Sequence, residues 1–333
     1  MAERAKVSLT TVSYVLSGRN GGSTRISKAT QERVSAAARE LGYVPNQAAR
    51  GMRRGRTDLV AVALCDLDRD WDRALAAAAA RILPLHGYQP VILLGETWRQ
   101  FMLAGGADGL ILSTVPRDAV ADPTVAELAQ RGVAQVVVSE SLLPEGFDVL
   151  APEPTEGIED CLDFLTARHT RIACLRRREP QDGGLSRYDR YASGLERAGI
   201  PLDPALVRTS EHRRDLAYQA ALELLSLPDR PTAIFATHDM EALQAVRAAY
   251  RLGLQVPEDV QVIGVGNSAE GRETDPALSS VGPDPVFETV VTMLLDRLSG
   301  KTPLDGVRVA APWKLILRGT TVQPAHQTTA AGR

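Results

Sequence analysis

Hydrophobic residues in the first 44 positions of the chain recur at helical spacing. Ser8 and Ser27 each precede such a segment and are good N-caps, because a serine hydroxyl can accept a bond from an otherwise unpaired backbone N–H. The pattern predicts three short helices, over residues 1–5, from Leu9 to Leu16, and from Ser27 to Leu41. The apolar faces consist of Val12, Val15 and Leu16 in the second helix and of Val34, Ala37, Ala38 and Leu41 in the third.

From Leu59 onward the pattern changes to short, continuous apolar runs separated by longer helical segments. Continuous apolar runs indicate strands buried on both faces, as in a parallel sheet covered by helices on either side. Two such series, the second beginning near Ile158, predict two similar α/β lobes. A helix over 285–298 and the runs VRVAA and WKLIL would supply further crossings between the lobes. The other predicted helices are 71–86, 124–131, 158–168, 188–198, 215–225 and 240–252, and the predicted strands are LVAVAL, PVILL, GLILS, QVVVS, RIACL, AIFA and VQVIG.

Charge is distributed unevenly along the chain. The formal net charge is −3, but residues 1–56 contain eleven Lys and Arg against three Glu, and the remaining residues carry a net −11. A basic segment attached to an acidic body indicates that the segment binds a polyanion, while the body is repelled by it. A solvated basic face without a partner is the alternative.

The composition, with 44% hydrophobic and 24% charged residues, is that of an ordinary globular protein. The sequence has no apolar run long enough to span a membrane and no apolar stretch at its beginning that predicts export. Cys65, Cys161 and Cys174 are too widely spaced to suggest a disulfide framework, and we interpret them as buried free thiols. We therefore expect a cytoplasmic protein.

The second predicted helix presents small polar side chains. Ser8, Thr10, Thr11 and Ser13 carry hydroxyls, and Tyr14 follows them. A helix that enters a DNA major groove, about 12 Å wide, needs such side chains on its outer face, because they can donate to phosphate oxygens or base edges. Two short helices joined by a tight turn therefore predict a helix-turn-helix. The alternative is a helical hairpin that packs on the body.

The segments VSLTTVSYVLSG and RISKATQERVSAAARELGYVPNQAARGMRRGRT resemble the head of LacI/GalR-type bacterial transcriptional regulators. The resemblance continues through ADGLIL, HTRIACL, DRPTAIFATHDMEALQAVRAAYRLGLQVPEDVQVIGVG and DPALSSV, and so covers essentially the whole chain. It implies an α/β protein in which a three-helix head with a helix-turn-helix precedes a periplasmic-binding-protein-like core of two doubly wound parallel-sheet lobes. It also implies a homodimeric repressor of a pseudo-palindromic DNA operator, with a small-molecule effector between the lobes.

The resemblance assigns the head to 1–44, a hinge helix and linker to 45–57, and the core to 58–320. Within the core, the first lobe would comprise about 58–150 and 278–306, and the second about 151–277 and 307–320. We expect the polar tail, 321–333, to be disordered. The family's first helix normally begins several residues before the position of Met1, so we also expect a translation start upstream.

Carried over by position, the resemblance implies three sets of DNA-binding residues. Leu9, Thr10 and Tyr14 would read bases; Tyr14 stands where many members have Arg, and its ring suits a thymine methyl better than a guanine. Ala49 and Met52 belong to the hinge, where Met52 would wedge into the minor groove. The positions implied to contact phosphates are Ser8, Thr11, Ser13, Ser27, Thr30, Tyr43 and Asn46.

The resemblance also implies an effector site in the cleft between the lobes. Trp71 could stack on a sugar face, or it could be an aromatic residue at the edge of the core. Arg187 corresponds to the family's effector-binding Arg, with a surface ion pair as its alternative role, and His238 could instead cap the helix that follows it. We predict a sugar-like or other polyol effector, with a different small molecule or an unresponsive site as alternatives. The implied effector positions are Trp71, Asp72, Glu153, Arg187, His238, Asp239 and Asn267.

Two other functions use a similar core: a solute-binding protein and a nucleotide-dependent α/β enzyme. The first would need export and would have no use for a basic head. For the second, GVGNSA (Gly264 to Ala269) fits a dinucleotide-binding pattern after a strand, but a poor helix follows it, near the end of the chain. The five His residues lack metal-binding spacing. We predict no metal, no cofactor and no catalytic activity.

Overall fold

The computed structural model describes residues 1–16, 26–43, 55–113, 122–177, 186–211, 213–284 and 286–322. The chain forms two compact units, Met1–Asp58 and Leu59–Arg333, which we call the head and the core. Of the predicted positions, Asn46, Ala49, Met52 and most of the tail, 323–333, lie outside the described residues. None of the helices in the described ranges is long and apolar enough to cross a membrane.

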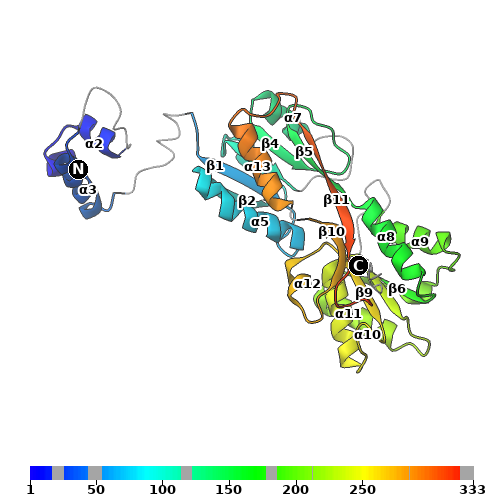
Figure 1. Cartoon of the computed structure of the whole chain (residues 1–333). Coiled ribbons are helices and arrows are strands. Elements are labelled where there is room, and N and C mark those ends of the chain that lie inside the picture. Colours follow the sequence, from blue (N-terminus) through cyan, green and yellow to red (C-terminus); the bar gives the residue numbers. More distant parts are fainter. Residues whose placement is uncertain are drawn as a thin grey trace, which may run out of the picture. The chain divides into compact units, whose positions relative to one another are not determined.

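The described residues of the head form three helices (Figure 1): α1 (Ala2–Ala5), α2 (Leu9–Leu16) and α3 (Lys28–Glu40). Ala5, Val12, Val34 and Ala37 are buried together between them, which accounts for the helical spacing of the apolar residues. The Oγ of Ser8 accepts a hydrogen bond from the N–H of Thr11 at 3.1 Å, and Ser27 Oγ accepts one from the N–H of Thr30 at 3.3 Å. Both predicted N-caps are confirmed.

In the part of the core that the structure describes, eleven strands lie in the order β2-β1-β3-β4-β5-β11-β10-β9-β8-β6-β7. All neighbours run parallel except β10 and β11. The strands are β1 (Leu59–Leu64), β2 (Gln89–Leu94), β3 (Gly109–Leu112), β4 (Ala134–Val138), β5 (Asp148–Glu153), β6 (Ile172–Arg177), β7 (Val207–Ser210), β8 (Ala233–Ala236), β9 (Gln261–Val265), β10 (Ser279–Pro283) and β11 (Arg308–Ile316).

One strand, β11, belongs to both lobes. Its first part, Arg308 to Pro312, pairs in parallel with Val149 to Glu153 of β5, and its second part, from Trp313 to Ile316, pairs antiparallel with β10. The first lobe therefore contains β1 to β5 and the beginning of β11, and the second contains β6 to β10 and its end. VRVAA and WKLIL, expected as separate strand-like runs, form this single strand.

Helices cover both faces of the first lobe's sheet: α5 (Asp70–Ile82) and α13 (Phe287–Leu298) on one face, α6 (Thr97–Leu103) and α7 (Pro123–Gln130) on the other. Val60, Val62 and Leu64 of β1 join the α5/α13 cluster, whereas Ala61 and Ala63 join the α6/α7 cluster. Successive side chains of a strand point to opposite faces, so a continuous apolar run is needed to serve both clusters.

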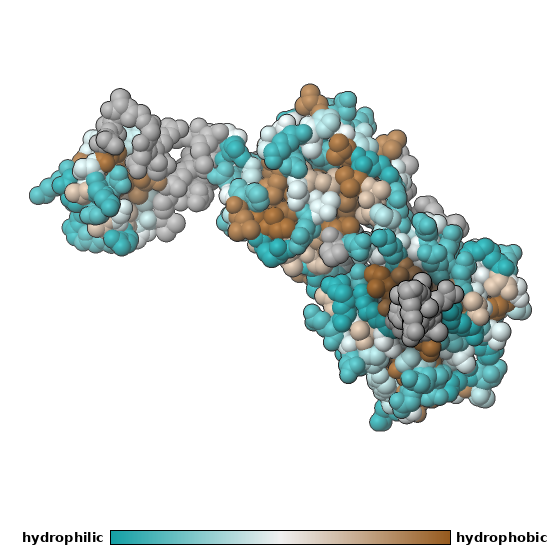
Figure 2. Space-filling model, in the orientation of Figure 1, coloured by the Kyte–Doolittle hydropathy of each residue, from teal (hydrophilic) through white to brown (hydrophobic). Residues whose placement is uncertain are grey.

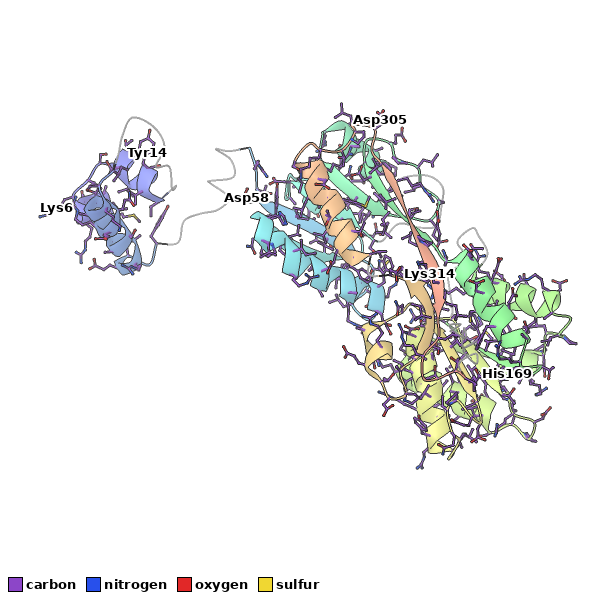
Figure 3. The ribbon with its side chains drawn as sticks, in the orientation of Figure 1. Lys6, Tyr14, Asp58, His169, Asp305 and Lys314 are labelled. Atoms are coloured by element: carbon purple, nitrogen blue, oxygen red, sulfur yellow. The ribbon has the colours of Figure 1, made fainter. Side chains whose placement is uncertain are left out.

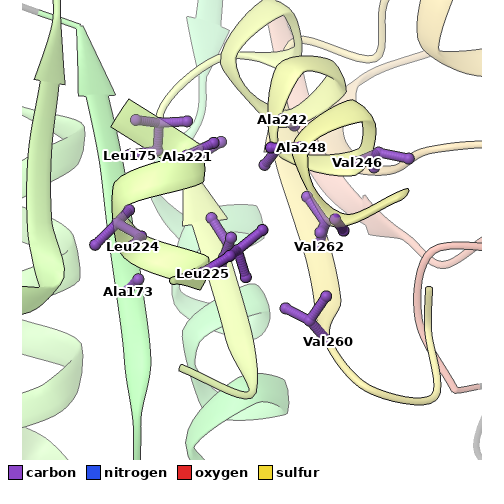
Figure 4. Packing of buried hydrophobic residues seen from close by; sticks show 14 of the residues in the cluster. Ala173, Leu175, Ala221, Leu224, Leu225, Ala242, Val246, Ala248, Val260 and Val262 are labelled. Atoms are coloured by element: carbon purple, nitrogen blue, oxygen red, sulfur yellow. The ribbon is translucent and has the colours of Figure 1, made fainter. Parts of the chain in front are cut away.

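The second lobe repeats this arrangement. Its sheet is covered by α8 (Thr155–Thr166) and α9 (Arg187–Arg197) on one face and by α10 (Arg214–Leu225) and α11 (Asp239–Arg251) on the other. Figure 4 shows the second of these clusters, in which Leu224 and Leu225 of α10 and Val246 of α11 pack over Leu175 and Val262 of the strands. A short helix, α12 (Ala269–Glu273), follows β9.

The strand pairing corrects two of the expected lobe boundaries. β10 was expected in the first lobe, but it pairs with β9 of the second. Residues 308–312 were expected in the second lobe, but they pair with β5 of the first. The chain thus crosses between lobes after Glu153, between Pro283 and Phe287, and between Pro312 and Trp313.

The structure differs from the predictions in three further places. The helix predicted over 71–86 ends at Ile82 and continues as the 3-10 turn η1 (Leu83–His86), because Pro84 cannot donate a helical hydrogen bond. The strands β5, β7 and β10 were not predicted, since polar residues or proline interrupt their apolar runs. Cys161 and Cys174 are buried free thiols as expected, but Cys65, just after β1, is exposed.

Candidate DNA-binding surface and ligand cleft

The outer face of α2 carries the predicted base-reading residues. Leu9 is 80% exposed and Tyr14 is 43% exposed, and Thr10 and Ser13 are also exposed, while Val12 of the same helix is buried. Figure 3 shows Tyr14 on the head, together with Lys6. The exposed side chain of Leu9 is free to make an apolar contact such as one with a thymine methyl.

Four of the predicted phosphate-contacting residues form two equivalent hydroxyl pairs at helix N-termini. The Oγ of Ser8 lies 2.9 Å from Thr11 Oγ1, and Ser27 Oγ lies 2.9 Å from Thr30 Oγ1. The N-terminus of a helix carries a partial positive charge and unpaired N–H groups, so each pair stands where a phosphate would be favoured. Tyr43 is 46% exposed.

The short first helix is held to the head by its end and by an ion pair. Lys6 follows α1 in the left-handed conformation, with φ of 50°, and its N–H donates to Glu3 O at 3.2 Å. Arg4 Nε donates to Glu40 Oε2 on α3 at 3.0 Å, and this bond holds the pKa of Glu40 below its usual value. Val7 and Met1 pack against the head cluster. These contacts hold α1 on α3.

In the core, a cavity of about 480 Å³ lies between the two lobes. α5 of the first lobe forms one wall, with Trp71 in its first turn, and the segment 266–273 of the second lobe forms the other. Both walls follow the carboxyl ends of strands, β1 and β9, which is where ligands bind to open α/β sheets. The other residues lining the cavity are Asp70, Arg73, Ala74, Ala77, Pro283 and Phe287.

Asp72, expected to bind the effector, is instead buried beside β1. Its carboxylate accepts hydrogen bonds from the N–H groups of Cys65 and Asp66, at 2.9 and 3.0 Å, and from Ser113 Oγ at 3.2 Å. Burial raises the pKa of Asp72, although these donors favour its ionised form. Asp72 therefore fixes the turn after β1 against the end of β3 and does not line the cavity.

Asp239 and Asn267 have similar bonding roles in the second lobe. The buried carboxylate of Asp239 accepts bonds from the N–H of Ser268 and from Ser280 Oγ, both at 2.6 Å. Burial raises the pKa of Asp239. Asn267 lines the cavity, but its side-chain amide donates to Pro283 O at 2.9 Å and accepts from Arg318 at 2.6 Å. The two residues shape the cavity wall.

The remaining predicted effector residues lie apart from the lining of this cavity. Glu153, at the end of β5, forms an ion pair with Arg308 at 3.3 Å. Arg187 begins α9, and its Nη1 donates to Thr237 O at 2.6 Å. His238 occupies the N-cap position of α11 without a side-chain capping bond. The structure thus brings only Trp71 and Asn267 of the seven predicted positions to the cavity.

Two residues of the cleft region were not predicted. Phe287 lines the cavity and packs against Trp71 with ring centroids 4.9 Å apart, and Trp313 stacks on Trp71 at 6.4 Å. Phe287 lay inside a predicted helix, so only its aromatic character could have suggested a site. Nothing near Trp313 in the sequence marks it, because its position depends on the change of pairing along β11.

Two family models match the chain. Residues 1–46 match the model of bacterial regulatory proteins of the lacI family, and residues 163–321 match a periplasmic binding protein-like domain.

Several characterised proteins are similar over nearly the full length. The transcriptional repressor CytR of Escherichia coli K12 is 32% identical, with 96% of this chain and 95% of CytR covered. The transcriptional regulator CelR of Thermobifida fusca is 30% identical, with 96% of each covered. Among solved structures, the Lac repressor bound to ONPG in the repressed state superposes with a TM-score of 0.71 at 25% identity, covering 96% of this chain and 98% of that one. A CelR–cellobiose complex superposes with a TM-score of 0.60 at 29% identity, covering 96% and 98%.

Proposed function

The chain belongs to the LacI family of bacterial transcriptional regulators, and from this premise we propose that it is a repressor whose affinity for its operator is set by a small molecule. It is a DNA-binding regulator with a helix-turn-helix head and a periplasmic-binding-protein-like core. The proposal concerns the details: which residues touch DNA, how the chain assembles, and what the cleft binds.

The observation that carries the DNA-binding proposal is the exposed face of α2. Leu9, Thr10, Ser13 and Tyr14 project from a helix whose other face is fixed by Val12 in the head cluster. The head is also the basic part of the chain, so phosphates attract it while the acidic core is repelled. We propose that Leu9, Thr10 and Tyr14 read base edges and that the capping hydroxyls contact phosphates on either side.

We propose that two chains bind one operator. A single short helix reads too few base pairs to select a site, and two heads related by two-fold symmetry read a pseudo-palindrome. The segment with Asn46, Ala49 and Met52 would supply the minor-groove contact between the half-sites. A cytoplasmic location follows from this function.

For the core we propose an effector in the cavity between the lobes. Trp71 and Phe287 offer apolar surface, and carboxylates and guanidinium groups surround them, a combination suited to a polar ring such as a sugar. The CelR–cellobiose complex has the same fold and is consistent with such a ligand. Ligand binding in the cleft would shift the lobes and alter the spacing of the two heads.

The test is selection of duplexes from a random DNA library by the full-length protein, followed by binding measurements on the selected duplex. Thr10→Ala should weaken binding to the selected duplex and relax its preference over random DNA, while Ser35→Ala, an exposed hydroxyl on α3 outside the proposed interface, should not. We expect affinity to fall by a factor of about 1,000 or more between 50 and 200 mM salt, as for proteins with six to ten phosphate contacts. Enrichment of no sequence, or turnover of a nucleotide substrate, would favour the alternatives.

A further inference from the structure

Three aromatic side chains meet where the chain crosses between the lobes. Trp71, in the first lobe, lies edge-on to Phe287 at an interplanar angle of 66° and is stacked on Trp313 at 20°. Phe287 is the first residue of α13, just after the second crossing. Trp313 is the first residue of β11 that pairs with the second lobe. The cluster therefore lies at two of the three crossings.

Within this cluster Trp71 packs against both lobes. It contacts the α5/α13 cluster of the first lobe and also the α8/α9 cluster of the second, to which Trp313 belongs. Trp313 itself is 7% exposed. A Cβ added at Gly157 of α8 would lie 2.6 Å from Trp313 O, so α8 holds the backbone of Trp313 closely. Trp313 therefore moves with the second lobe. Any shift of the lobes relative to each other must change the contact between Trp313 and Trp71.

The second lobe also acts on Trp313 through Arg187. The guanidinium carbon of Arg187 lies 5.3 Å from the Trp313 ring centroid, a cation–π contact, while its Nη1 is bonded to Thr237 O. The buried Nε1–H of Trp313 has no acceptor among the described residues. A buried donor without an acceptor is unfavourable, so packing and the cation–π contact, rather than a hydrogen bond, fix the orientation of the Trp313 ring.

We propose that Trp71 and Trp313 form a latch between the lobes, and that Arg187 is the residue that positions Trp313 for it. The Arg187 guanidinium holds the Trp313 ring in the orientation that stacks on Trp71. Loss of either contact frees the two lobes to move relative to each other.

The latch can be tested in the full-length protein without any effector, by hydrogen exchange and mass spectrometry. Trp71→Leu removes the first-lobe partner, so we expect exchange to rise about threefold to tenfold in segment 266–273 of the other lobe, as for loss of one aromatic pair. Trp313→Leu should do the same in segment 65–72 of the first lobe. Trp71→Phe and Trp313→Phe keep a stacked ring and should restore exchange close to the wild-type rate.

Two further variants separate the latch from general destabilisation. Trp98→Leu removes a tryptophan buried in the α6/α7 cluster, away from the crossings, and should leave exchange in 266–273 unchanged. Arg187→Lys keeps the charge but loses the planar group, and should raise exchange in 65–72 as Trp313→Leu does. If Trp313→Leu does not fold, Trp71→Leu still tests the latch, because Trp71 is only half-buried.

Unchanged exchange across the cleft in Trp71→Leu, or no restoration by phenylalanine, would rule out the latch. Failure of the proposed function is a different result: the wild-type protein would then select no duplex, whatever the exchange rates.

Discussion

At the scale of single residues, Lys6 is the position where sequence and conformation disagree most clearly. It adopts a left-handed backbone, which only glycine takes without strain. Lys6→Gly should therefore stabilise the head by about 1 kcal/mol. Calorimetry of the head transition would measure this. Lys6→Ala removes the charge but keeps the strain, so an equal gain with alanine would contradict the explanation.

Tyr14 is the residue whose exchange should alter sequence preference. An arginine there could bond a guanine bidentately, with about 1–3 kcal/mol of discrimination against other bases. Duplexes selected by Tyr14→Arg should therefore gain a guanine at one position in each half-site. Selection of the same sequences by variant and wild type would show that Tyr14 lies away from the bases.

Residue-scale features divide into those that could be predicted from the sequence and those that could not. Ser8 and Ser27 were predictable, because a capping hydroxyl acts on a backbone N–H three residues away. Asp72 was not, since its role depends on Ser113, 41 residues further on. From sequence, a carboxylate at the start of a helix serves equally well to bind a ligand or to fix a turn, and only its burial decides.

At the scale of elements, the attachment of α1 to α3 should depend on pH. The pKa of Glu40 is lowered by its hydrogen bond from Arg4, so the contribution of this pair is present above the pKa of an unfolded glutamate, about 4.3, and is lost as the pH falls through the lower folded value. The melting temperature of the head should fall over that range. In Glu40→Gln this part of the decrease should be absent. Identical pH profiles of the melting temperature for the variant and the wild type would contradict a role for the Arg4–Glu40 pair.

The packing of α11 on β9 depends on the absence of a side chain at Gly264. A Cβ there would lie 3.0 Å from both Ala242 Cβ and the Cα of Asp239, and would meet the Asp239 carboxylate. Gly264→Ala should destabilise the core by about 1–3 kcal/mol, the usual effect of overpacking. Denaturant unfolding measures this. The close helix–strand approach, rather than a nucleotide phosphate, accounts for the glycine in GVGNSA, and an unchanged midpoint would show that α11 can shift.

The number of elements was easier to predict than their partners. Strands β1, β3 and β4 were evident because apolar residues serve clusters on both faces. β10, with the sequence SSVGP, is as deeply buried, but it lies beside β11 and its serines find partners such as Thr320 and Asp239. Those partners come from distant parts of the chain, so no local pattern reveals them.

At the scale of the whole molecule, the shared strand β11 should make the two lobes unfold together. Leu294 of α13 and Leu224 of α10 are both fully buried, one in each lobe. Leu294→Ala and Leu224→Ala should each cost about 2–5 kcal/mol and lower the same calorimetric transition, separate from that of the head. Two core transitions that respond to one variant each would show that the lobes are independent.

Charge also acts at this scale. Figure 2 shows hydrophilic side chains over most of the visible face of the core, with apolar ones gathered near α5 and β2. The excess of acidic groups in the core repels the polyanion to which the basic head is attracted. The sequence alone was sufficient to predict this division, because net charge requires no knowledge of contacts.

The late position of β11 has a consequence for synthesis. While the ribosome is still translating the first 307 residues, the nascent polypeptide exposes an unpaired edge on β5 and another on β10. Unpaired edges invite association with other chains. β11 completes the sheets of both lobes. A chain truncated before residue 308 would therefore leave each lobe with an unpaired strand edge that is prone to aggregation.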